Sequence, residues 1–392
     1  MMQGTALRLS AFFGALFLVH GVSLAYLPVW LDSRGLSAAE IAAATSAPMM
    51  LRLLVTPGIA FAADRSTAHR ELIVGASLCA LALLLALTLP WSVAVTILLI
   101  VLAQIAIGTI MPMADTLTMA EVKRSGLDYG RVRAWGSLTF ILAGYMAGYS
   151  VAAHGASAVL VLMAAGIALT AAAGILLPRT DVGSFASAGA GASAVTSRLT
   201  VADVMRLAQD RNFVLFLLAA GAIQSSHAVI YVFGVLHWRA QGLSPGYIAT
   251  LWAIAVLAEI ALFWGGRRVT SIGPLQLVMI GAVACVVRWL SMTFDPPALL
   301  LVPLQVLHAG TFAATHLGSM HWIAARVPAP MAGTAQALLA TFTAGVAMAG
   351  AMFVSGPLFA AWEGRAYLAM AALGIVGLVA VVALQRAERR KA

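Results

Sequence analysis

Several ionisable side chains lie well inside long apolar stretches of the sequence, where a charge is costly unless it is paired, neutralised or hydrated. They are Arg52, Glu259, Arg288 and three histidines, His20, His227 and His308. Groups of this kind usually face the interior of a helix bundle or a water-filled cavity, and they mark the path of an ion or a solute. The chemistry that they predict is the binding of a polar solute and the transfer of protons.

Glu259 is the main candidate for carrying a proton, because a buried carboxylate is stable only when it is protonated, paired or hydrated. His227 and His308 could assist it. The alternative for Glu259 is a static pair with an arginine, and Arg288 is a doubtful partner because a rise of ~1.5 Å per residue places it roughly 10 Å away along the membrane normal. The alternative for the histidines is that each is a satisfied interior group.

The two intramembrane arginines, Arg52 and Arg288, cannot lose their charge and therefore need an anion nearby. Either one could bind a substrate carboxylate, or either could pair with a helix C-terminus or an acidic residue. Polar and aromatic side chains at similar depth complete the candidate substrate site: His20, Gln224, Tyr231, Trp252, Gln305 and Phe312.

Metal chemistry and enzyme chemistry are not expected. His308, His316 and His321 have offsets that do not place all three on one helix face, so they predict no metal site. Clustered carboxylates at one depth, which a membrane-embedded enzyme would need, are not found either. We expect no cofactor, with the proton as the coupling ion.

The composition predicts an all-α membrane protein. Hydrophobic residues make up 62% of the 392 residues and charged residues only 9%, too few to cover a soluble protein of this size. Continuous apolar runs of about 20 residues match helices that cross ~30 Å of hydrocarbon, whereas a β-barrel would show alternating polarity. The expected spans are 9–31, 39–63, 72–90, 92–119, 132–153, 157–177, 212–237, 245–265, 274–293, 298–322, 332–356 and 364–385.

The basic residues predict the orientation of the chain. Of the 23 Lys and Arg residues, only Arg34, Arg239 and Arg365 fall in loops opposite to the side that holds the termini, and Arg52 and Arg288 lie within spans. Positive charge is enriched in cytoplasmic loops, so we expect both termini in the cytoplasm. Because the basic residues are spread over short loops, the net charge of +9 does not indicate a nucleic-acid partner.

A small, polar stretch and a repeated pattern divide the chain into two six-helix halves. Residues 179–211 read as a cytoplasmic linker with a short amphipathic helix, between bundles at 1–178 and 212–392. Trp30, Gly35 and Ser37 after the first span match Trp238, Gly242 and Ser244 after the seventh, which indicates duplication in parallel orientation. At the cytoplasmic end, Asp115 and Arg133, with Asp64 and Arg65, could form an ion-paired gate or a simple clamp.

With these residues in view, the chain resembles the major facilitator superfamily over its full length, and within it the phenylpropionate permease group. The resemblance rests on L-D-Y-G-R-V-R-A-W-G-S (127–137), P-M-A-D-T-L (112–117), S-H-A-V-I-Y (226–231), L-W-A-I-A-V-L-A-E-I (251–260), C-V-V-R-W (285–289) and L-H-A-G-T-F-A-A-T-H-L (307–317). It implies alternating access between two six-helix bundles and uptake by proton symport. The positions it carries over are Arg52, Asp115, Arg133, His227, Glu259, Arg288, His308 and His316.

Two departures from the pattern matter. The superfamily's loop signature after the second span survives only as Asp64-Arg65, and His20 stands where the resembling transporters have an aromatic residue. The leading hypothesis is proton-coupled import of a small organic anion, such as an aromatic carboxylate, by a monomer in the bacterial inner membrane. The alternatives are a proton symporter of a neutral sugar or nucleoside, a drug exporter of the same fold, and a channel.

Overall fold

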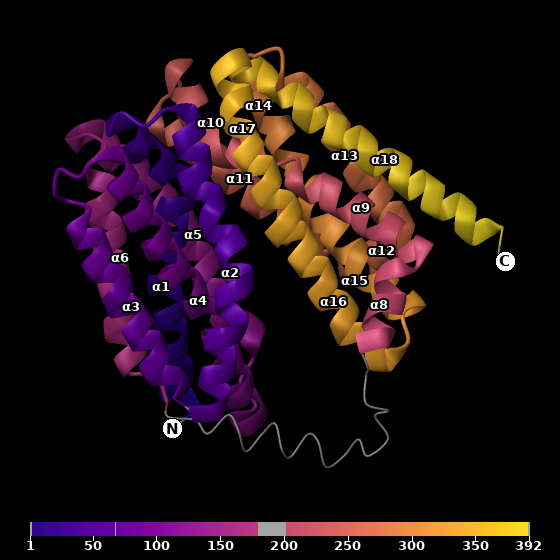
Figure 1. Ribbon diagram of the computed structural model, residues 1–392, viewed down its shortest axis with the longest axis horizontal. Helices are drawn as coiled ribbons and strands as arrows, with labels where there is room; N and C mark the ends of the chain where they lie inside the picture. The colour runs from indigo at the N-terminus through magenta and orange to yellow at the C-terminus, as the bar shows by residue number, and fades with distance from the viewer. Residues whose placement is uncertain (1, 67, 179–200, 391–392) are drawn as a thin grey trace. The chain divides into compact units, whose positions relative to one another are not determined.

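The computed structural model describes residues 2–66, 68–178 and 201–390, and every regular element in these ranges is a helix (Figure 1). Two compact units are present: residues 1–194 with 244–249, and residues 195–243 with 250–392. Residues 179–200 of the expected linker lie outside the described part of the chain. The domain boundaries at 178 and 211 stay predictions.

The first unit is built from six long helices. Helix α1 packs mainly against α5 and α6, α3 packs against α4 and α6, and α2 packs against α4. The buried face of α1 is apolar and includes Phe12, Phe13, Leu16 and Val19. The helices are α1 (Met2–Ser33), α2 (Ala38–Ser66), α3 (His69–Ala86), α4 (Val93–Ser125), α5 (Tyr129–His154) and α6 (Ala158–Ile175).

The second unit begins with the short helix α8 (Val201–Gln209), which precedes the first long helix of this half. The helices that follow are α9 (Arg211–Ser225), α10 (Ala228–Ala240), α11 (Pro245–Trp264), α12 (Gly266–Thr270), α13 (Pro274–Met292), α14 (Ala298–Val306), α15 (Thr315–Arg326), α16 (Ala332–Ala340), α17 (Met348–Trp362) and α18 (Tyr367–Arg389). Helix α13 packs against α15 and α18, and α18 also packs against α9.

Three expected spans of the second unit are not continuous α-helices. The seventh breaks between α9 and α10, at Ser226 and His227. The tenth and eleventh contain π-helical segments, η1 (Ala309–Ala314) and η3 (Thr341–Ala347). Such wide turns are uncommon and are frequent at functional sites. In the first unit, by contrast, Pro28, Pro48, Pro57 and Pro112 lie inside continuous α-helices.

In the part of the chain that the structure describes, the helices make twelve membrane crossings. Among the described residues, eleven helical runs are long and apolar enough to cross a membrane, and the last of them, Ala332–Arg389, has 58 residues. That run holds two crossings, because the 3-10 turn η4 (Glu363–Ala366) separates α17 from α18 and begins with Glu363 at a φ of 47°. Figure 1 shows α17 and α18 as separate helices that meet at this turn.

The turn after the first span of each half has the glycine and the serine cap that the sequence predicted. Gly35 adopts a φ of 79° after α1, and Ser37 forms a reciprocal capping pair with Glu40 at the start of α2, with Ser37 N–H 2.8 Å from Glu40 Oε2. After α10, Gly242 adopts a φ of 80°, and Ser244 Oγ accepts a hydrogen bond from the Tyr247 amide at 3.3 Å. The two corresponding turns therefore end and begin their helices in the same way.

Gly21 tests the close packing of α1 on α5. A Cβ at Gly21 would lie 2.7 Å from the Phe140 carbonyl oxygen and 2.8 Å from Ala143 Cβ, whereas a Cβ at Gly144 of α5 would meet nothing within 4 Å. We expect Gly21→Ala to destabilise the protein by about 1–3 kcal/mol, as overpacking does. Gly144→Ala should be neutral or slightly stabilising, because alanine favours helix. Thermal unfolding in detergent measures both, and an equal melting temperature for the two variants would contradict this packing.

Candidate substrate and proton site

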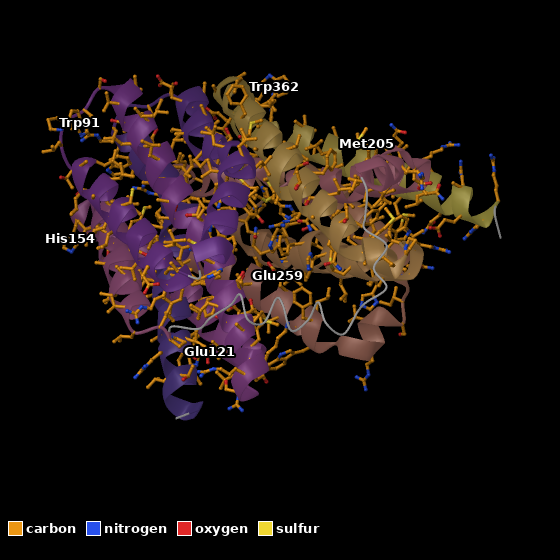
Figure 2. The ribbon with its side chains drawn as sticks, turned by 60° about the horizontal axis from the view of Figure 1, so that its bottom comes forward. Trp91, Glu121, His154, Met205, Glu259 and Trp362 are labelled. Carbon is orange, nitrogen blue, oxygen red and sulfur yellow. The ribbon has the colours of Figure 1, made fainter. Side chains whose placement is uncertain are left out.

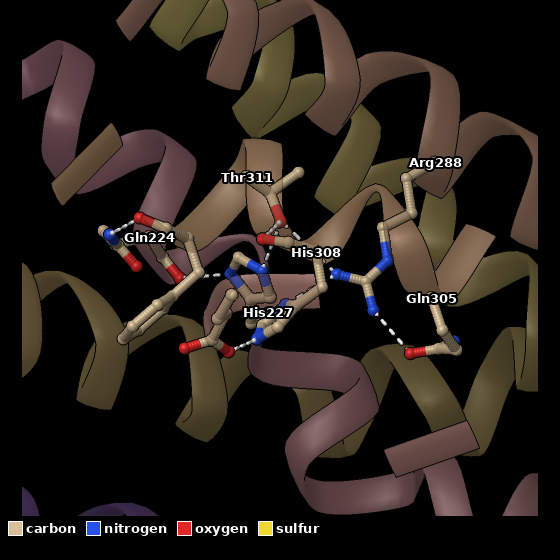
Figure 3. Close-up of polar contacts among 8 residues, drawn as sticks. Gln224, His227, Arg288, Gln305, His308 and Thr311 are labelled. Carbon is tan, nitrogen blue, oxygen red and sulfur yellow. Dashed lines mark hydrogen bonds and ion pairs between the residues drawn. The ribbon is translucent and has the colours of Figure 1, made fainter. Parts of the chain in front are cut away.

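His227 lies at the break between α9 and α10 and is fully buried. Its Nδ1 is 2.9 Å from the Gln224 carbonyl oxygen, and its Nε2 is 2.9 Å from Thr311 Oγ1 (Figure 3). A carbonyl oxygen can only accept, so Nδ1 carries the proton of this imidazole. When His227 is neutral, its Nε2 must accept a hydrogen bond from Thr311.

Arg288, on α13, is 1% exposed and is surrounded by neutral partners. Its guanidinium donates to Gln305 Oε1 at 2.8 Å, to His308 Nδ1 at 2.9 Å and to Thr311 Oγ1 at 3.4 Å. It also lies over the Trp289 ring, 4.4 Å from the ring centroid. Among the described residues, no carboxylate contacts this guanidinium directly.

His308 connects Arg288 to Glu259. Its Nε2 lies 2.7 Å from Oε1 of Glu259, a residue of α11 that is marked in Figure 2. Its Nδ1 faces Arg288. Because a guanidinium has no acceptor atom, Nδ1 of His308 must be unprotonated, and Nε2–H donates to the carboxylate. The imidazole therefore bridges a carboxylate and a guanidinium that the sequence placed too far apart to pair directly.

The π-helical segment η1 contributes one side chain and one backbone carbonyl to this cluster. Thr311, which is fully buried, contacts both His227 and Arg288, and the carbonyl oxygen of Phe312 accepts a hydrogen bond from Gln224 Nε2 at 3.3 Å. The residues of the cluster come from four separate segments: the α9–α10 break, α11, α13 and the α14–η1 run.

Aromatic rings continue from the polar cluster. Tyr231 stacks on His227 with ring centroids 5.5 Å apart, and Trp252 stacks on Tyr231 at 6.1 Å. Phe312 stacks on His308 at 5.5 Å. The structure thus gathers the residues expected on one apolar wall, Tyr231, Trp252 and Phe312, around His227 and His308.

Arg52 lies in the first unit, and its side chain packs directly on α4. A Cβ added to Gly108 would lie 2.8 Å from the Arg52 Cζ, so a larger residue at this position would require the Arg52 side chain to shift. Arg52 Nε is buried and, among the described residues, has no hydrogen-bond partner. Arg288 Nε is buried and without a partner in the described residues too, whereas both terminal nitrogens of Arg288 are hydrogen-bonded.

The other polar residues expected in the first unit have local partners. His20 Nδ1 is 2.9 Å from the Leu16 carbonyl oxygen, and its ring stacks on Phe17 with centroids 5.6 Å apart. Gln104, on α4, donates to Ser23 Oγ on α1 at 2.9 Å. The contacts of His20 leave open whether it touches a substrate, so its role stays a prediction.

The residues of the expected gate are arranged differently from a simple ion pair. Asp115 accepts a hydrogen bond from the Tyr129 hydroxyl at 2.9 Å, and Arg133 lies over the Phe17 ring, 3.8 Å from its centroid. Asp64 and Arg65 belong to the last turns of α2, but their side chains lie outside the described residues. A gating role for these four residues stays a prediction.

Sequence reasoning missed Thr311 and Ser226. Ser226, next to His227, accepts hydrogen bonds from Trp289 Nε1 at 2.8 Å and from Cys285 Sγ at 3.0 Å, which fixes the helix break against α13. The sequence signals for them are weak: Ser226 is next to His227, and Thr311 comes three residues after His308. His316, which the resemblance also suggested, is exposed on α15.

Two known transporters are similar to this chain in sequence over most of its length. The chain is 29% identical over 314 residues to a probable 3-phenylpropionic acid transporter of Escherichia coli (strain K12), covering 79% of this chain and 80% of that protein. It is 28% identical over 387 residues to a maltose permease of Geobacillus stearothermophilus, covering 96% and 94%.

Two solved transporters have the same architecture at low sequence identity. The nucleoside transporter NupG superposes with a TM-score of 0.82 at 17% identity, over 97% of this chain and 98% of that one. The D-xylose-proton symporter gives a TM-score of 0.70 at 12% identity, over 97% and 96%. The MFS_1 like family model matches residues 6–369. The chain therefore belongs to the MFS_1 like family, and it is a multi-pass secondary transporter of the major facilitator fold, not an enzyme.

Proposed function

We propose that this transporter imports a small organic anion, such as an aromatic carboxylate, together with a proton. The observation that carries the proposal is the bridge from Glu259 through His308 to Arg288. As long as Glu259 is charged, the bridge neutralises Arg288 inside the bilayer, where an isolated charge is costly. A proton on Glu259 removes that compensation and loosens the bridge. Binding a proton would therefore affect the three segments that the bridge joins, which are α11, α13 and the α14–η1 run.

Arg52 is the proposed anion contact, in preference to Arg288. Both arginines have a buried Nε without a partner in the described residues, but the terminal nitrogens of Arg288 are already engaged by Gln305, His308 and Thr311. A substrate carboxylate could therefore accept from the guanidinium of Arg52 without displacing such partners. The rings of Tyr231, Trp252 and Phe312 suit an aromatic or aliphatic body on the solute. The E. coli relative, described as a probable 3-phenylpropionic acid transporter, supports this substrate class.

A neutral sugar is the second candidate substrate. The maltose permease is almost as similar in identity and covers more of the chain than the phenylpropionic acid relative. A neutral solute would leave the charge of Arg52 uncompensated, which is why we favour the anion. The two candidates separate in a thermal-shift comparison of 3-phenylpropionate, its neutral amide and maltose on the purified protein.

Glu259→Gln tests the coupling. Glutamine keeps an acceptor for His308 but cannot release a proton, so the variant should bind and exchange solute while losing accumulation driven by a pH gradient. Labelled 3-phenylpropionate uptake and counterflow in proteoliposomes measure the two activities. Glu71→Gln, an exposed carboxylate in the first unit, is the matched control and should behave like the wild type. Undiminished gradient-driven accumulation in Glu259→Gln would rule out this proton carrier.

Arg52→Ala tests the anion contact. Loss of a hydrogen bond between charged groups, about 1.5–3 kcal/mol, predicts a roughly 10- to 100-fold weaker affinity for 3-phenylpropionate. The neutral amide should bind with unchanged affinity, and Arg239→Ala, which removes an exposed charge, should change neither. Titration calorimetry gives both affinities. An equal loss of affinity for the acid and the amide would show that Arg52 supports the fold and does not bind the carboxylate of the solute.

The orientation follows from the basic loops: we propose that both termini face the cytoplasm of a bacterial cell and that the protein lies in the inner membrane. A fluorescent protein fused after Ala392 should then be bright, while alkaline phosphatase fused in the loop at 241–243 should be active outside. If alkaline phosphatase fused at the C-terminus were active, the proposed orientation would be wrong.

A further inference from the structure

The geometry points to Thr311 as a positioning residue that lets His227 exist in both its neutral and its charged form inside the bilayer. This inference rests on the proposed proton coupling and adds a second titrating group to it. Three contacts carry it: Thr311 Oγ1 lies 2.9 Å from His227 Nε2, 3.4 Å from an Arg288 terminal nitrogen and 3.2 Å from the His308 carbonyl oxygen.

A hydroxyl has one hydrogen to donate and two lone pairs that accept. When His227 is neutral, its Nδ1–H donates to the Gln224 carbonyl and its bare Nε2 needs a donor, which the Thr311 hydroxyl supplies. The Arg288 N–H then donates to a free lone pair of the same oxygen. All polar atoms of the contact are satisfied in this state.

When His227 takes up a proton, its Nε2 becomes a donor and the hydroxyl must turn. The Thr311 hydrogen then points to the carbonyl oxygen of His308, one turn earlier in the same helix, and Oγ1 accepts from both His227 and Arg288. The position of the oxygen is unchanged, so a rotation of one O–H bond accommodates the proton. A valine in its place would leave a buried polar atom without a partner in either state.

The groups around His227 fit a switch that Thr311 controls. Tyr231 on its own helix, His308 from the tenth span and Trp289 from α13 surround the ring, with centroids 5.5, 4.9 and 5.4 Å away. The charged groups that face it are Arg288, directly behind Thr311, and Glu259, beyond His308. The carboxylate is thus separated from His227 by another imidazole, and the atom in contact with its Nε2 is the threonine hydroxyl.

The two histidines should therefore hold opposite neutral tautomers, with the proton on Nδ1 in His227 and on Nε2 in His308. Nuclear magnetic resonance of ¹⁵N-histidine-labelled protein in nanodiscs reads tautomer and protonation directly. Loss of a signal in His227→Gln, and of another in His308→Gln, assigns the two rings. An Nε2–H tautomer for neutral His227 would overturn the inference.

Thr311→Val and Thr311→Ser then separate the effect of the hydroxyl group from the effect of the size and shape of the side chain. Hydrogen bonds to a charged donor are about twice as strong as neutral ones, so the valine variant should lose the charged form of His227 preferentially. Its protonation midpoint, and the midpoint of pH-dependent solute exchange, should move to lower pH by about one unit, a tenfold change in proton affinity. Thr311→Ser keeps the hydroxyl and should titrate like the wild type.

Thr343→Val is the matched control. Thr343 also lies in a π-helical segment, but among the described residues its hydroxyl donates to the Leu339 carbonyl alone, one turn earlier in the same span. It should leave both midpoints unchanged. Wild-type midpoints in Thr311→Val, or equal shifts in Thr343→Val, would refute the role of Thr311. Either result leaves Glu259→Gln as a separate test, so failure of this inference and failure of the proposed coupling are distinguishable.

Discussion

Compensation of the Arg288 charge inside the bilayer is the constraint on which the second unit depends. A guanidinium that is 1% exposed cannot be left alone in hydrocarbon, and it cannot be neutralised by losing a proton. The guanidinium is stabilised by the Gln305 amide, the Thr311 hydroxyl and the Trp289 ring. It also donates to the His308 imidazole, which in turn donates to the Glu259 carboxylate. Gln305, His308 and Thr311 come from the α14–η1 run and the carboxylate comes from α11, so compensation of this charge on α13 requires these segments to pack together.

Regular helices alone would not solve that problem. The α9–α10 break turns His227 toward the tenth span, and the wide turn η1 carries Thr311 to meet it. Backbone groups freed at such irregular points need partners in a membrane, and here side chains provide some of them, as when Gln224 donates to the Phe312 carbonyl. The irregular geometry of these spans and the polar cluster therefore support each other.

The sequence was sufficient for the fold and insufficient for the contacts. Lengths of apolar runs, the paired Gly35 and Gly242 turns and the small, polar linker predicted twelve helices in two halves, because hydrocarbon thickness and helix rise leave few alternatives. Depth along the membrane normal also singled out Glu259, His308 and Arg288. Depth could not show that His308 bridges the other two, since a rise per residue says nothing about rotation around the helix axis.

The same limit explains Thr311 and the gate. A π-helical turn shifts the register of every residue after it, so the side chains that face the cluster from the tenth span cannot be read from a regular 3.6-residue period. Asp115 accepts a hydrogen bond from Tyr129, and Arg133 lies over the Phe17 ring. Aromatic neighbours of this kind cannot be predicted from the pattern of charges.

The absence of a side chain at Gly108 has its own consequence for how this protein tolerates change. A Cβ on Gly108 would overlap the Arg52 side chain, so even Gly108→Ala requires the guanidinium to take another position. The identity of residue 108 therefore helps to set where the buried charge of Arg52 lies.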